Sequence, residues 1–358
     1  MLFKSLFVWR RSPVAVASLA SLAVAISACG RGLPGPTDAR ATAPRPATTR
    51  LHAPGQITLF TQPESGSGAI VGAIDGARHS VWLQMYMVTD PVVVEALGRA
   101  AARGLEVRVL LEETPAQPGQ NRQVAADLEA RGVLVAWTNP AFSLTHAKTM
   151  LIDGEVAYVL TYNLTRAATA SNRELAVIDR AQSDVAELKR IFVADWNREA
   201  YMPVDPDLVV SPENARRRIL GLMTRARREL LVGVEVLNDA EVVATLVEQR
   251  RAGVDVRVLV GSVRKLPANL PAARTLVAQG VPTRSQGRPY LHAKYMVADG
   301  ERAYLGSINL SSQSLDSNRE LGLLIGEGPA IGQMRDVFLR DWGGARDPEA
   351  DAPEARRR

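Results

Sequence analysis

The sequence predicts an α/β protein built from two repeated lobes, each with a mixed β-sheet. Helical and strand-like segments alternate through most of the chain, which is typical of α/β folds. The second observation is an internal repeat that returns the same residue types at a fixed distance. The chain has 358 residues, of which 46% are hydrophobic, so it is large enough to bury the core of two lobes.

The repeat is clearest around two histidines. His146-Ala147-Lys148 recurs as His292-Ala293-Lys294, 146 residues later. The same spacing links further polar residues: Asp153 with Asp299, Asn163 with Asn309, Asn172-Arg173-Glu174 with Asn318-Arg319-Glu320, and Asp195-Trp196 with Asp341-Trp342. Each lobe therefore contains one copy of the same polar pattern.

The first 28 residues have the pattern of an export signal. Lys4, Arg10 and Arg11 precede an uncharged, mostly apolar stretch that is too short for a membrane-spanning helix. It ends in Ile26-Ser27-Ala28-Cys29-Gly30, which resembles the bacterial lipobox, and this resemblance implies that Cys29 carries a lipid anchor. We expect a lipoprotein of the bacterial cell envelope, tethered to the extracytoplasmic side of a membrane; an ordinary secretory signal is the alternative.

A flexible linker is predicted for residues 29–56, because five prolines lie there without apolar periodicity. We assign the first lobe to residues 57–202, the second to 203–345 and a polar tail to 346–358. Without residues 1–28 the formal net charge falls from +5 to about +2, since that segment is basic and holds no acid. A strongly basic surface for nucleic acid is therefore not predicted.

Within the first lobe, strand-like and helical patterns follow in a regular order. A strand is predicted over Ser80–Met87, a helix over Val92–Arg103 that Gly104 terminates, and a strand over Val107–Leu111. After a loop come a further helix, the strands that carry the histidine motif, and a closing helix with one apolar stripe. The loop is Glu112–Asn121, the helix lies near Val124–Arg131, and the stripe is Val185, Leu188, Phe192 and Trp196.

The second lobe repeats this order after a join near Pro203–Pro212. Its predicted elements are a strand over Leu230–Leu237, a helix over Glu241–Arg251, a strand over Val256–Val260, a loop over Gly261–Pro271 and a helix ending at Gly280. Its closing helix has the stripe Ile331, Met334, Phe338 and Trp342. A run of arginines near the start of this lobe is interpreted as a solvated helix face, with contact to anionic lipid or nucleic acid as the alternative: Arg216, Arg217, Arg218, Arg225, Arg227 and Arg228.

Each copy of the repeat contains His-x-Lys-x4-Asp, followed by asparagine ten residues after the aspartate. This pattern resembles the signature of the phospholipase D superfamily, and the resemblance covers about residues 57–345. It implies a bilobal phospholipase D fold, with two α/β/α-sandwich lobes related by a pseudo-twofold axis. Because each motif supplies one histidine, one active site is expected between the lobes, and a monomer suffices to form it.

The resemblance also implies the chemistry. A phosphodiester is anionic, so its cleavage needs cationic donors, a neutral nucleophile and an acid for the leaving oxygen. Family practice makes His146 the nucleophile, which forms a phosphohistidine, and His292 the general acid and base; the sequence alone does not decide between them. No metal and no cofactor is expected.

The remaining motif residues are given supporting roles by the same resemblance. Lys148, Lys294, Asn163, Asn309, Ser307 and Thr161 are expected to bind the phosphate. Glu174 and Glu320 are expected to hydrogen-bond a histidine across the lobe interface. Asp153 and Asp299 complete the catalytic motifs, and we interpret them as orienting or structural groups, since each precedes a glycine in a common turn pair.

Two positions depart from the repeat. Leu160 stands where the second lobe has Gly306, which predicts a narrower pocket or weaker activity. Tyr86 has Glu235 as its counterpart; Tyr86 is expected to line the substrate mouth, and Glu235 to make a polar contact of unknown role. The other two histidines, His52 and His79, are interpreted as structural.

The motif fixes the reaction type better than the substrate. An exported, lipid-anchored protein of near-neutral charge meets phospholipid constantly, so membrane phospholipid is expected both as substrate and as anchor surface. We expect hydrolysis or headgroup exchange of glycerophospholipids, giving phosphatidic acid and an alcohol. The alternatives are a cardiolipin synthase-like phosphatidyl transfer, a secreted nuclease acting on nucleic acid, and an inactive binding module.

Overall fold

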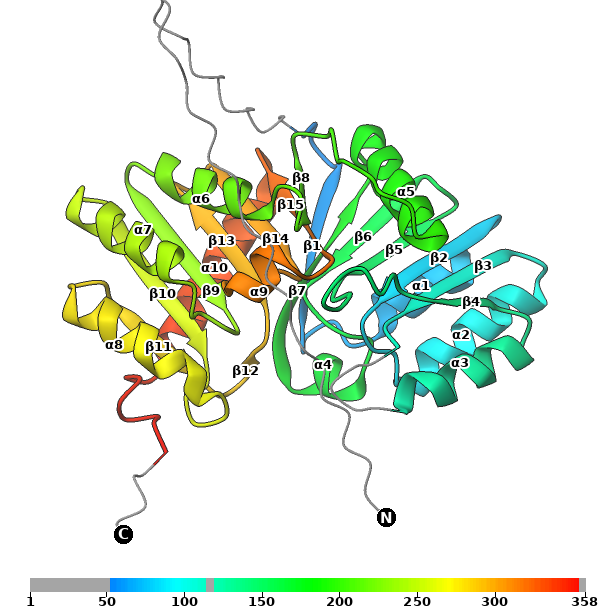
Figure 1. Ribbon diagram of the computed structural model, residues 1–358, viewed down its shortest axis with the longest axis horizontal. Coiled ribbons are helices and arrows are strands. Elements are labelled where there is room, and N and C mark those ends of the chain that lie inside the picture. The colour runs from blue at the N-terminus through cyan, green and yellow to red at the C-terminus, as the bar shows by residue number, and fades with distance from the viewer. Residues whose placement is uncertain (1–51, 114–118, 354–358) are drawn as a thin grey trace, which may run out of the picture. The chain divides into compact units, whose positions relative to one another are not determined.

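The computed structural model describes residues 52–113 and 119–353, and they form two mixed sheets, one in each lobe (Figure 1). The predicted export segment, Cys29 and most of the predicted linker lie outside the described residues. So do residues 114–118 of the predicted loop and the last five residues. Within the described ranges, the helices are too short or too polar to cross a bilayer.

The two sheets have the same strand order. In lobe one it is β1-β7-β6-β5-β2-β3-β4, and in lobe two it is β8-β15-β14-β13-β9-β10-β11. The strands of lobe one are β1 Ile57–Gln62, β2 Ser80–Met85, β3 Glu106–Leu111, β4 Leu134–Trp137, β5 Lys148–Ile152, β6 Val156–Leu160 and β7 Asn172–Asp179. Those of lobe two are β8 Leu208–Ser211, β9 Glu229–Val234, β10 Asp255–Gly261, β11 Thr283–Gln286, β13 Lys294–Ala298, β14 Arg302–Gly306 and β15 Glu320–Ile325.

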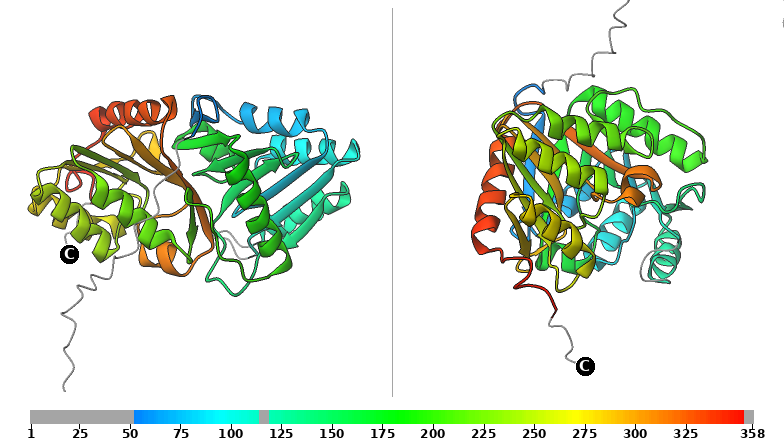
Figure 2. Two further views of the ribbon diagram at one scale, coloured as in Figure 1. Left: turned by 90° about the horizontal axis from the view of Figure 1, so that it is seen from above. Right: turned by 60° about the vertical axis from the view of Figure 1, so that its left-hand side comes forward.

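Helices cover both faces of each sheet, as Figures 1 and 2 show. Lobe one has α1 Gly68–Gly76, α2 Pro91–Ala102, α3 Gln120–Ala130, α4 Arg166–Ala170 and α5 Gln182–Asn197. Lobe two has α6 Ala215–Arg225, α7 Ala240–Arg251, the 3-10 turn Pro267–Asn269, α8 Leu270–Ala278, α9 Ser312–Asp316 and α10 Pro329–Gly344. The predicted mixed α/β fold with two repeated lobes is confirmed.

Local sequence explains where the helices begin and end. The carboxylate of Asp90 accepts from the amide of Val92 at the start of α2, and Asp239 caps α7 in the same way. Gly104 and Gly253 follow these helices with φ of 82° and 92°, a left-handed conformation that glycine adopts without steric cost.

Three apolar clusters form the core. One lies between the lobe-one sheet and α1, α2 and α3, and its counterpart packs the lobe-two sheet against α6, α7 and α8. The third contains residues of both lobes, including Phe192 of α5 and Phe338 of α10. Because this third cluster contains residues of both lobes, the two lobes are joined by a common hydrophobic core.

Strand pairing also crosses from lobe to lobe. The short strand β12, Tyr290–Leu291, pairs in parallel with the start of β7, and Thr145 forms a parallel bridge with Arg319. Both segments lie just before a motif histidine, so backbone hydrogen bonds fix the entry to each motif on the opposite lobe.

Several predictions about the fold were incomplete. The opening strand and helix of lobe one, β1 and α1, were not predicted, and β8 occupies the predicted join at Pro203–Pro212. Residues 52–56, predicted as the end of the linker, are fixed on lobe one, where Gln56 accepts from the amide of Arg180. These segments are short and make mostly long-range contacts, which local sequence patterns do not reveal.

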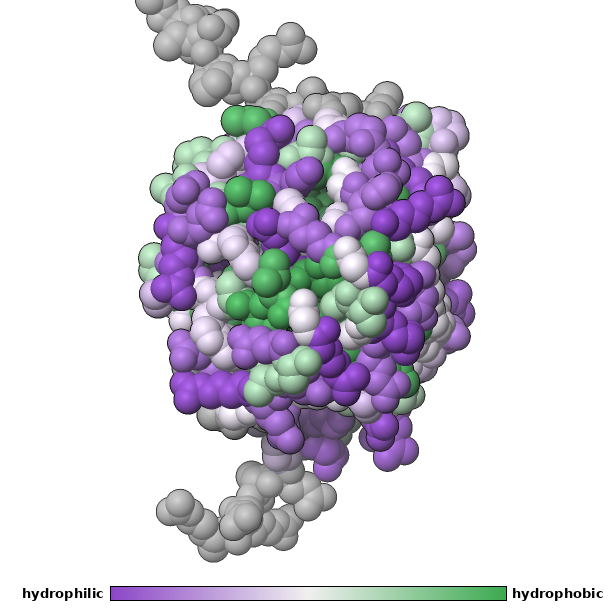
Figure 3. Space-filling model, turned by 90° about the vertical axis from the view of Figure 1, so that its right-hand side faces the viewer, coloured by the Kyte–Doolittle hydropathy of each residue, from purple (hydrophilic) through white to green (hydrophobic). Residues whose placement is uncertain are grey.

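The predicted polar tail is wrong for its first part. Arg346 forms an antiparallel bridge with Ser285 of β11, and the carboxylate of Asp351 accepts from the hydroxyls of Ser262 and Ser285 at 2.8 and 2.6 Å. This segment therefore covers the outer edge of the lobe-two sheet. In lobe one the corresponding edge strand is β4, and Figure 3 shows this end of the molecule, where hydrophilic side chains surround a small apolar area.

Candidate active site

The two motif histidines meet between the lobes. His146 precedes β5 and His292 precedes β13, the equivalent strands in the two sheets. The amide of His146 donates to the carbonyl of Arg319 at 2.8 Å, and the amide of His292 donates to that of Arg173 at 3.3 Å. Each histidine is thus held by the backbone of the lobe it does not belong to.

Each imidazole also contacts a carboxylate of the opposite lobe. His146 Nδ1 lies 2.9 Å from Glu320 Oε2, and His292 Nδ1 lies 2.7 Å from Glu174 Oε1. Both glutamates are fully buried. A carboxylate at Nδ1 fixes the tautomer with hydrogen on that nitrogen and leaves Nε2 for chemistry. The predicted cross-interface pairs are therefore present.

The two motif lysines are buried beside the histidines. Lys148 Nζ donates to the carbonyl of His146 at 2.7 Å, and Lys294 Nζ donates to the carbonyl of His292 and to Glu235 Oε2, at 2.9 Å for the latter. Two ammonium groups in one buried cluster provide the positive charge that a phosphate needs.

Electrostatics separate His146 from an ordinary surface histidine. Burial, together with the nearby Lys148, lowers the pKa of His146 to about 4 despite the opposing effect of Glu320. The pKa of Lys148 is also well below its usual value, because of burial and the charge of Lys294. Burial alone would raise the pKa of Glu320, but His146 and Lys148 outweigh it and lower this pKa. His146 is therefore a neutral imidazole near pH 7.

A cavity of about 620 Å³ opens beside His146. Amide and hydroxyl side chains dominate its walls, and most of them come from lobe two. The lining residues are Tyr86, Leu144, His146, Val236, Asn238, Asn309, Ser311, Ser312, Gln313, Ser314, Asn318 and Glu320. A phosphodiester with a polar substituent has space next to the His146 imidazole.

The Asn-Arg-Glu repeat holds this arrangement together. Asn172 and Asn318 donate to Glu174 and Glu320, at 3.3 and 3.0 Å. The intervening arginines form buried ion pairs across the interface: Arg173 with Asp341 at 2.8 Å, and Arg319 with Asp195 at 3.1 Å. The sequence showed these arginines and aspartates as repeated, but it gave no role for them.

The family comparison agrees with this geometry. The model for "Cardiolipin synthase, PLD-like domain" matches residues 70–196 and 219–342. The chain belongs to the phospholipase D superfamily. It is thus an enzyme of a superfamily of phosphodiesterases and phosphatidyl transferases, and the predicted family membership is confirmed.

Individual relatives of this superfamily are distant. Cardiolipin synthase of Geobacillus kaustophilus (strain HTA426) is 24% identical over 80% of this chain, which spans 66% of that protein. Phospholipase D of Rickettsia conorii (strain ATCC VR-613 / Malish 7) is 30% identical over 40% of this chain and 68% of its own length.

A solved structure shares the fold. Phosphatidylserine synthase of Haemophilus influenzae Rd KW20 superposes with a TM-score of 0.61 at 13% identity, over 80% of this chain and 85% of that one. Identity this low supports the fold of the phospholipase D superfamily and nothing finer.

Not every predicted phosphate ligand is available. The Thr161 hydroxyl donates to Glu174 at 2.8 Å and accepts from the amide of Leu175, and the Ser307 hydroxyl bonds both backbone groups of Leu321. Both side chains are fully buried. Their prediction as phosphate ligands is corrected, because their hydrogen-bonding capacity is used within the fold.

The two motif asparagines remain candidates. Asn309 lines the cavity and its Oδ1 accepts from the amide of Val236 at 3.1 Å, which leaves its NH₂ group as a donor. Asn163 Oδ1 is buried and has no hydrogen-bond partner among the described residues. A role for both in binding phosphate oxygens stays a prediction.

The motif aspartates do not join the cluster, so their placement in the catalytic set is corrected. Asp153 follows the far end of β5, about 16 Å along the strand from Lys148. Its carboxylate accepts from the amides of Arg78, His79 and Ser80, and Asp299 binds the equivalent amides in lobe two. With φ of 56° and 58° they form the turns of two hairpins, as their Asp-Gly pairs predict.

Leu160 does not narrow the pocket. It is buried in the apolar cluster beneath α1 and α2, on the face of β6 opposite to Val159, which belongs to the shared core. In lobe two the corresponding space holds the ring of Tyr304, since a Cβ at Gly306 would overlap Tyr304 and the backbone of Gly322. The expected loss of activity therefore has no structural basis.

Asn121 and Asn269, which stand at similar places in the two lobes, were not predicted as residues of the site. Asn121 Nδ2 donates to the carbonyls of Tyr86 and Glu112, and Asn269 Nδ2 donates to those of Glu235 and Gly261. Each asparagine thereby ties the ends of two parallel strands beside the site. Both stand in segments that sequence patterns identify only as loops, although their near-equal spacing in the repeat is a usable signal.

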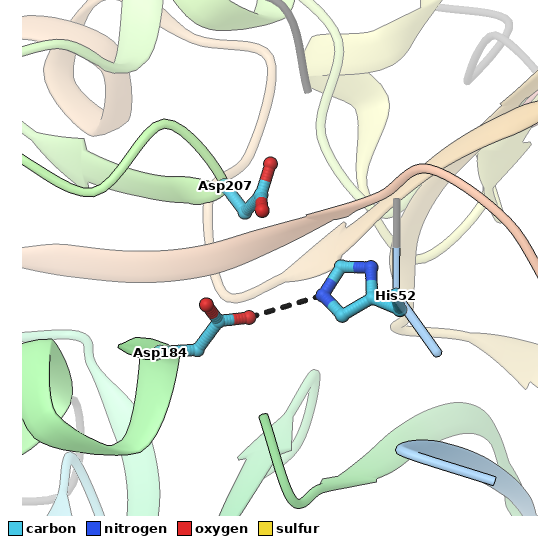
Figure 4. A group of neighbouring side chains, drawn as sticks. All are labelled: His52, Asp184 and Asp207. Atoms are coloured by element: carbon cyan, nitrogen blue, oxygen red, sulfur yellow. Dashed lines mark hydrogen bonds and ion pairs between the residues drawn. The ribbon is translucent and has the colours of Figure 1, made fainter. Parts of the chain in front are cut away.

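One group of described side chains has the spacing of metal ligands, away from the histidine pair. His52, Asp184 and Asp207 are buried, and one ligand atom of each lies within 4.8 Å of the others (Figure 4). His52 Nδ1 has no hydrogen-bond partner among the described residues, and His52 Nε2 contacts Asp184 Oδ2 at 3.0 Å. The interpretation of His52 as structural fits this contact.

Two arginines of the run, Arg216 and Arg228, contact carboxylates. Arg216 contacts Asp239, Glu241 and Asp316 at 2.5–2.8 Å, and Arg228 contacts Glu301 at 2.7 Å. These ion pairs lie within lobe two. They leave less positive charge available for lipid or nucleic acid than the sequence suggests.

Proposed function

We propose that the protein transfers the phosphatidyl group of a glycerophospholipid to an alcohol through a phosphohistidine. The observation that carries this proposal is the pair of cross-lobe contacts, His146 with Glu320 and His292 with Glu174, in one cluster with two buried lysines. This arrangement supplies a neutral nucleophile, a proton donor and positive charge around a single phosphate.

In the first step His146 Nε2 attacks phosphorus and the bond to the headgroup oxygen breaks. His292 gives its proton to that oxygen, so the headgroup leaves as an alcohol. In the second step the now neutral His292 takes the proton of the acceptor hydroxyl as its oxygen attacks phosphorus and the nitrogen–phosphorus bond breaks. The lysines and asparagines stabilise the charge on the phosphoryl oxygens.

The nature of the acceptor distinguishes transfer from hydrolysis. The sequence predicts hydrolysis or headgroup exchange, and in hydrolysis, which gives phosphatidic acid, water is the acceptor. The family model and the Geobacillus relative carry the name cardiolipin synthase, and they favour transfer to the alcohol of a second lipid. Hydrolysis is kept as the second candidate because of the similarity to the Rickettsia phospholipase D.

We further propose that the enzyme works at a membrane to which Cys29 anchors it, on the extracytoplasmic side. This part of the proposal is supported by the pattern of residues 1–29 alone. Anchoring would keep the site close to its phospholipid substrate.

The experiment uses the full-length chain in mixed micelles of bacterial phospholipids with EDTA, beside the His146→Ala variant. Lipid products and released headgroups are followed by mass spectrometry, and plasmid and single-stranded DNA are tested in parallel. From the native chain only, we expect new phosphodiester lipids in which the phosphatidyl group is joined to the acceptor alcohol, together with the released headgroup. Phosphatidic acid alone would establish hydrolysis, whereas DNA cleavage with untouched lipid would overturn the proposal in favour of a nuclease.

A further inference from the structure

The two lobes differ at one position next to the histidines. Tyr86 follows β2 and Glu235 follows the equivalent strand β9, and an asparagine side chain holds the backbone carbonyl of each. The backbones are therefore equivalent, while one lobe presents an aromatic ring to the site and the other a carboxylate.

Glu235 contacts three groups of the second motif. Its Oε2 lies 2.9 Å from Lys294 Nζ and 3.5 Å from His292 Nε2, and its Oε1 accepts from the Tyr290 hydroxyl at 3.1 Å. Burial would raise the pKa of Glu235, but His292 and Lys294 outweigh it and lower this pKa to about 2. Glu235 is thus an anion at every pH at which the enzyme is expected to work.

This carboxylate changes the surroundings of His292. Its Nδ1 lies 2.7 Å from Glu174 Oε1 and its Nε2 lies 3.5 Å from Glu235 Oε2, and an imidazolium, which carries a hydrogen on each nitrogen, suits a carboxylate on both sides. Lys294 Nζ lies 3.3 Å from Nδ1 and 3.5 Å from Nε2 of the same ring, and the negative charge of Glu235, 2.9 Å from Lys294 Nζ, opposes the charge of this lysine beside the imidazole.

His146 has different neighbours. The ring of Tyr86 meets it edge-on, with centroids 5.0 Å apart, and the same ring lies 5.4 Å from Lys148 Nζ. Among the described residues Glu320 is the one carboxylate in ion-pair contact with His146, and it takes Nδ1. Nε2 of His146 therefore keeps a lone pair directed away from Glu320, as a nucleophile requires.

We propose that Glu235 is a positioning residue that makes the two histidines unequal, holding His292 as the proton donor and leaving His146 as the nucleophile. The exchange of tyrosine for glutamate between the lobes thereby assigns the roles that the repeated motif alone leaves equivalent. This inference rests on the proposed phosphohistidine chemistry for its consequence, but the difference in protonation exists without substrate.

The first test needs no turnover. Diethyl pyrocarbonate acylates neutral imidazole, and the chain has four histidines whose reaction can be followed separately by peptide mass spectrometry at pH 6.5. The side chains of His146 and His292 are 14% and 15% exposed, so a difference in their rates reports protonation rather than access. His52 is buried and His79 exposed, and they serve as slow and fast references.

We expect His146 to react faster than His292 in the native chain. Glu235→Gln keeps the size of the side chain and an acceptor for Tyr290, and it should speed the reaction of His292 by roughly tenfold, the effect of one pH unit in its protonation. Glu229→Gln, at the other end of β9, is the matched control and should change neither rate. Equal rates for His292 in the native chain and in Glu235→Gln, with both folded by circular dichroism, would overturn the proposal.

The second test asks which histidine becomes phosphorylated. The chain is mixed with bis(p-nitrophenyl) phosphate, quenched in alkali and mapped by mass spectrometry. The native chain should carry the adduct on His146, and the double exchange Tyr86→Glu with Glu235→Tyr should move it to His292. An adduct that stays on His146 in the exchanged, folded chain contradicts the inference. Absence of any adduct in all chains contradicts the proposed function, while the acylation rates still decide the role of Glu235.

Discussion

At the scale of single residues, the site depends on carboxylates that reach across the interface. Glu174 and Glu320 are fully buried, and the carboxylate of each contacts one imidazole and one asparagine. An isolated buried carboxylate is unfavourable, and the polar partners of each glutamate offset this cost; for Glu320, His146 and Lys148 lower its pKa. Removing either partner should therefore affect catalysis more than folding of the surrounding strands.

Glu320→Gln tests this dependence. The amide keeps the shape of the side chain but no longer stabilises a charge on His146 or fixes its tautomer, and we expect kcat to fall about 10- to 100-fold. Rates of p-nitrophenol release from bis(p-nitrophenyl) phosphate provide the measurement, with Glu301→Gln, whose carboxylate pairs with Arg228 on the surface, as control. A variant with native kcat would show that the contact is not used.

The low pKa of His146 predicts an unusual acid limit. Only the neutral imidazole attacks phosphorus, and burial with the nearby Lys148 places its pKa at about 4. With a substrate whose leaving group needs no acid, the first step should persist as the pH falls from 7 to 5 and disappear as it passes through about 4. Single-turnover rates of the first p-nitrophenol release between pH 3.5 and 8, with circular dichroism to detect unfolding, check this. A midpoint near 6.5, the ordinary value of imidazole, would contradict it.

The repeat predicted the histidines, lysines and orienting glutamates because their types and spacing recur without insertion. It could not separate these residues from Thr161 and Ser307, which recur in the same motifs but donate inward to a glutamate and to the backbone. The Asp-Gly pair predicted the turn at Asp153, but a repeated spacing along a strand does not tell which end of that strand meets the substrate.

At the scale of elements, the two lobes fill the same strand order with different side chains. Lobe two packs Tyr304 against Gly306 and Gly322, whereas lobe one has Leu160 and Ala176 in the matching places. In the sequence, Leu160 differs from Gly306 at a position close to the motif, so it was expected near the phosphate. The sequence gives the position of Leu160 along its strand, but it does not show which residue on the neighbouring strand has changed to accommodate it.

These two packings predict that enlarging the side chain at 306 and shortening it at 160 both lower the stability of the protein. Gly306→Ala brings a methyl group too close to the backbone of Leu321 and Gly322 and to the hydroxyl of Tyr304, and overpacking of this kind costs about 1–3 kcal/mol. Leu160→Ala leaves a cavity in the lobe-one cluster and should cost about 2–5 kcal/mol. Urea unfolding measures both. Leu134→Ala on the exposed edge strand is the control, and a Gly306→Ala variant as stable as the native chain would refute this packing.

At the scale of the whole molecule, the lobes are joined by a shared core and by buried ion pairs. Arg173 contacts Asp341 and Arg319 contacts Asp195, each across the interface and each with both partners buried. The same arginines contact Glu64 and Glu213 of their own lobes. The internal repeat predicted two lobes, but the shared core could not be foreseen, because an apolar stripe shows which face of a helix is buried and not which residues it packs against.

Arg173→Ala should weaken the contact between the two lobes and lower the stability of the protein. It leaves the carboxylate of Asp341 buried without its cation, which typically costs about 3–5 kcal/mol. Urea unfolding of Arg173→Ala, Asp341→Asn and the double variant forms a cycle, in which we expect the double variant to be less destabilised than the sum of the singles. Additive effects would show that the pair is not coupled.

The central claim is that one site between the lobes works through a phosphohistidine at His146. The most direct measurement uses His292→Ala with bis(p-nitrophenyl) phosphate. The first step needs no acid with this leaving group, but the second lacks its base, so the adduct should accumulate. We predict a burst of one p-nitrophenol per chain and a p-nitrophenyl phosphoryl group on the peptide that contains His146. A burst of zero or two, or an adduct on any other residue, would contradict the account.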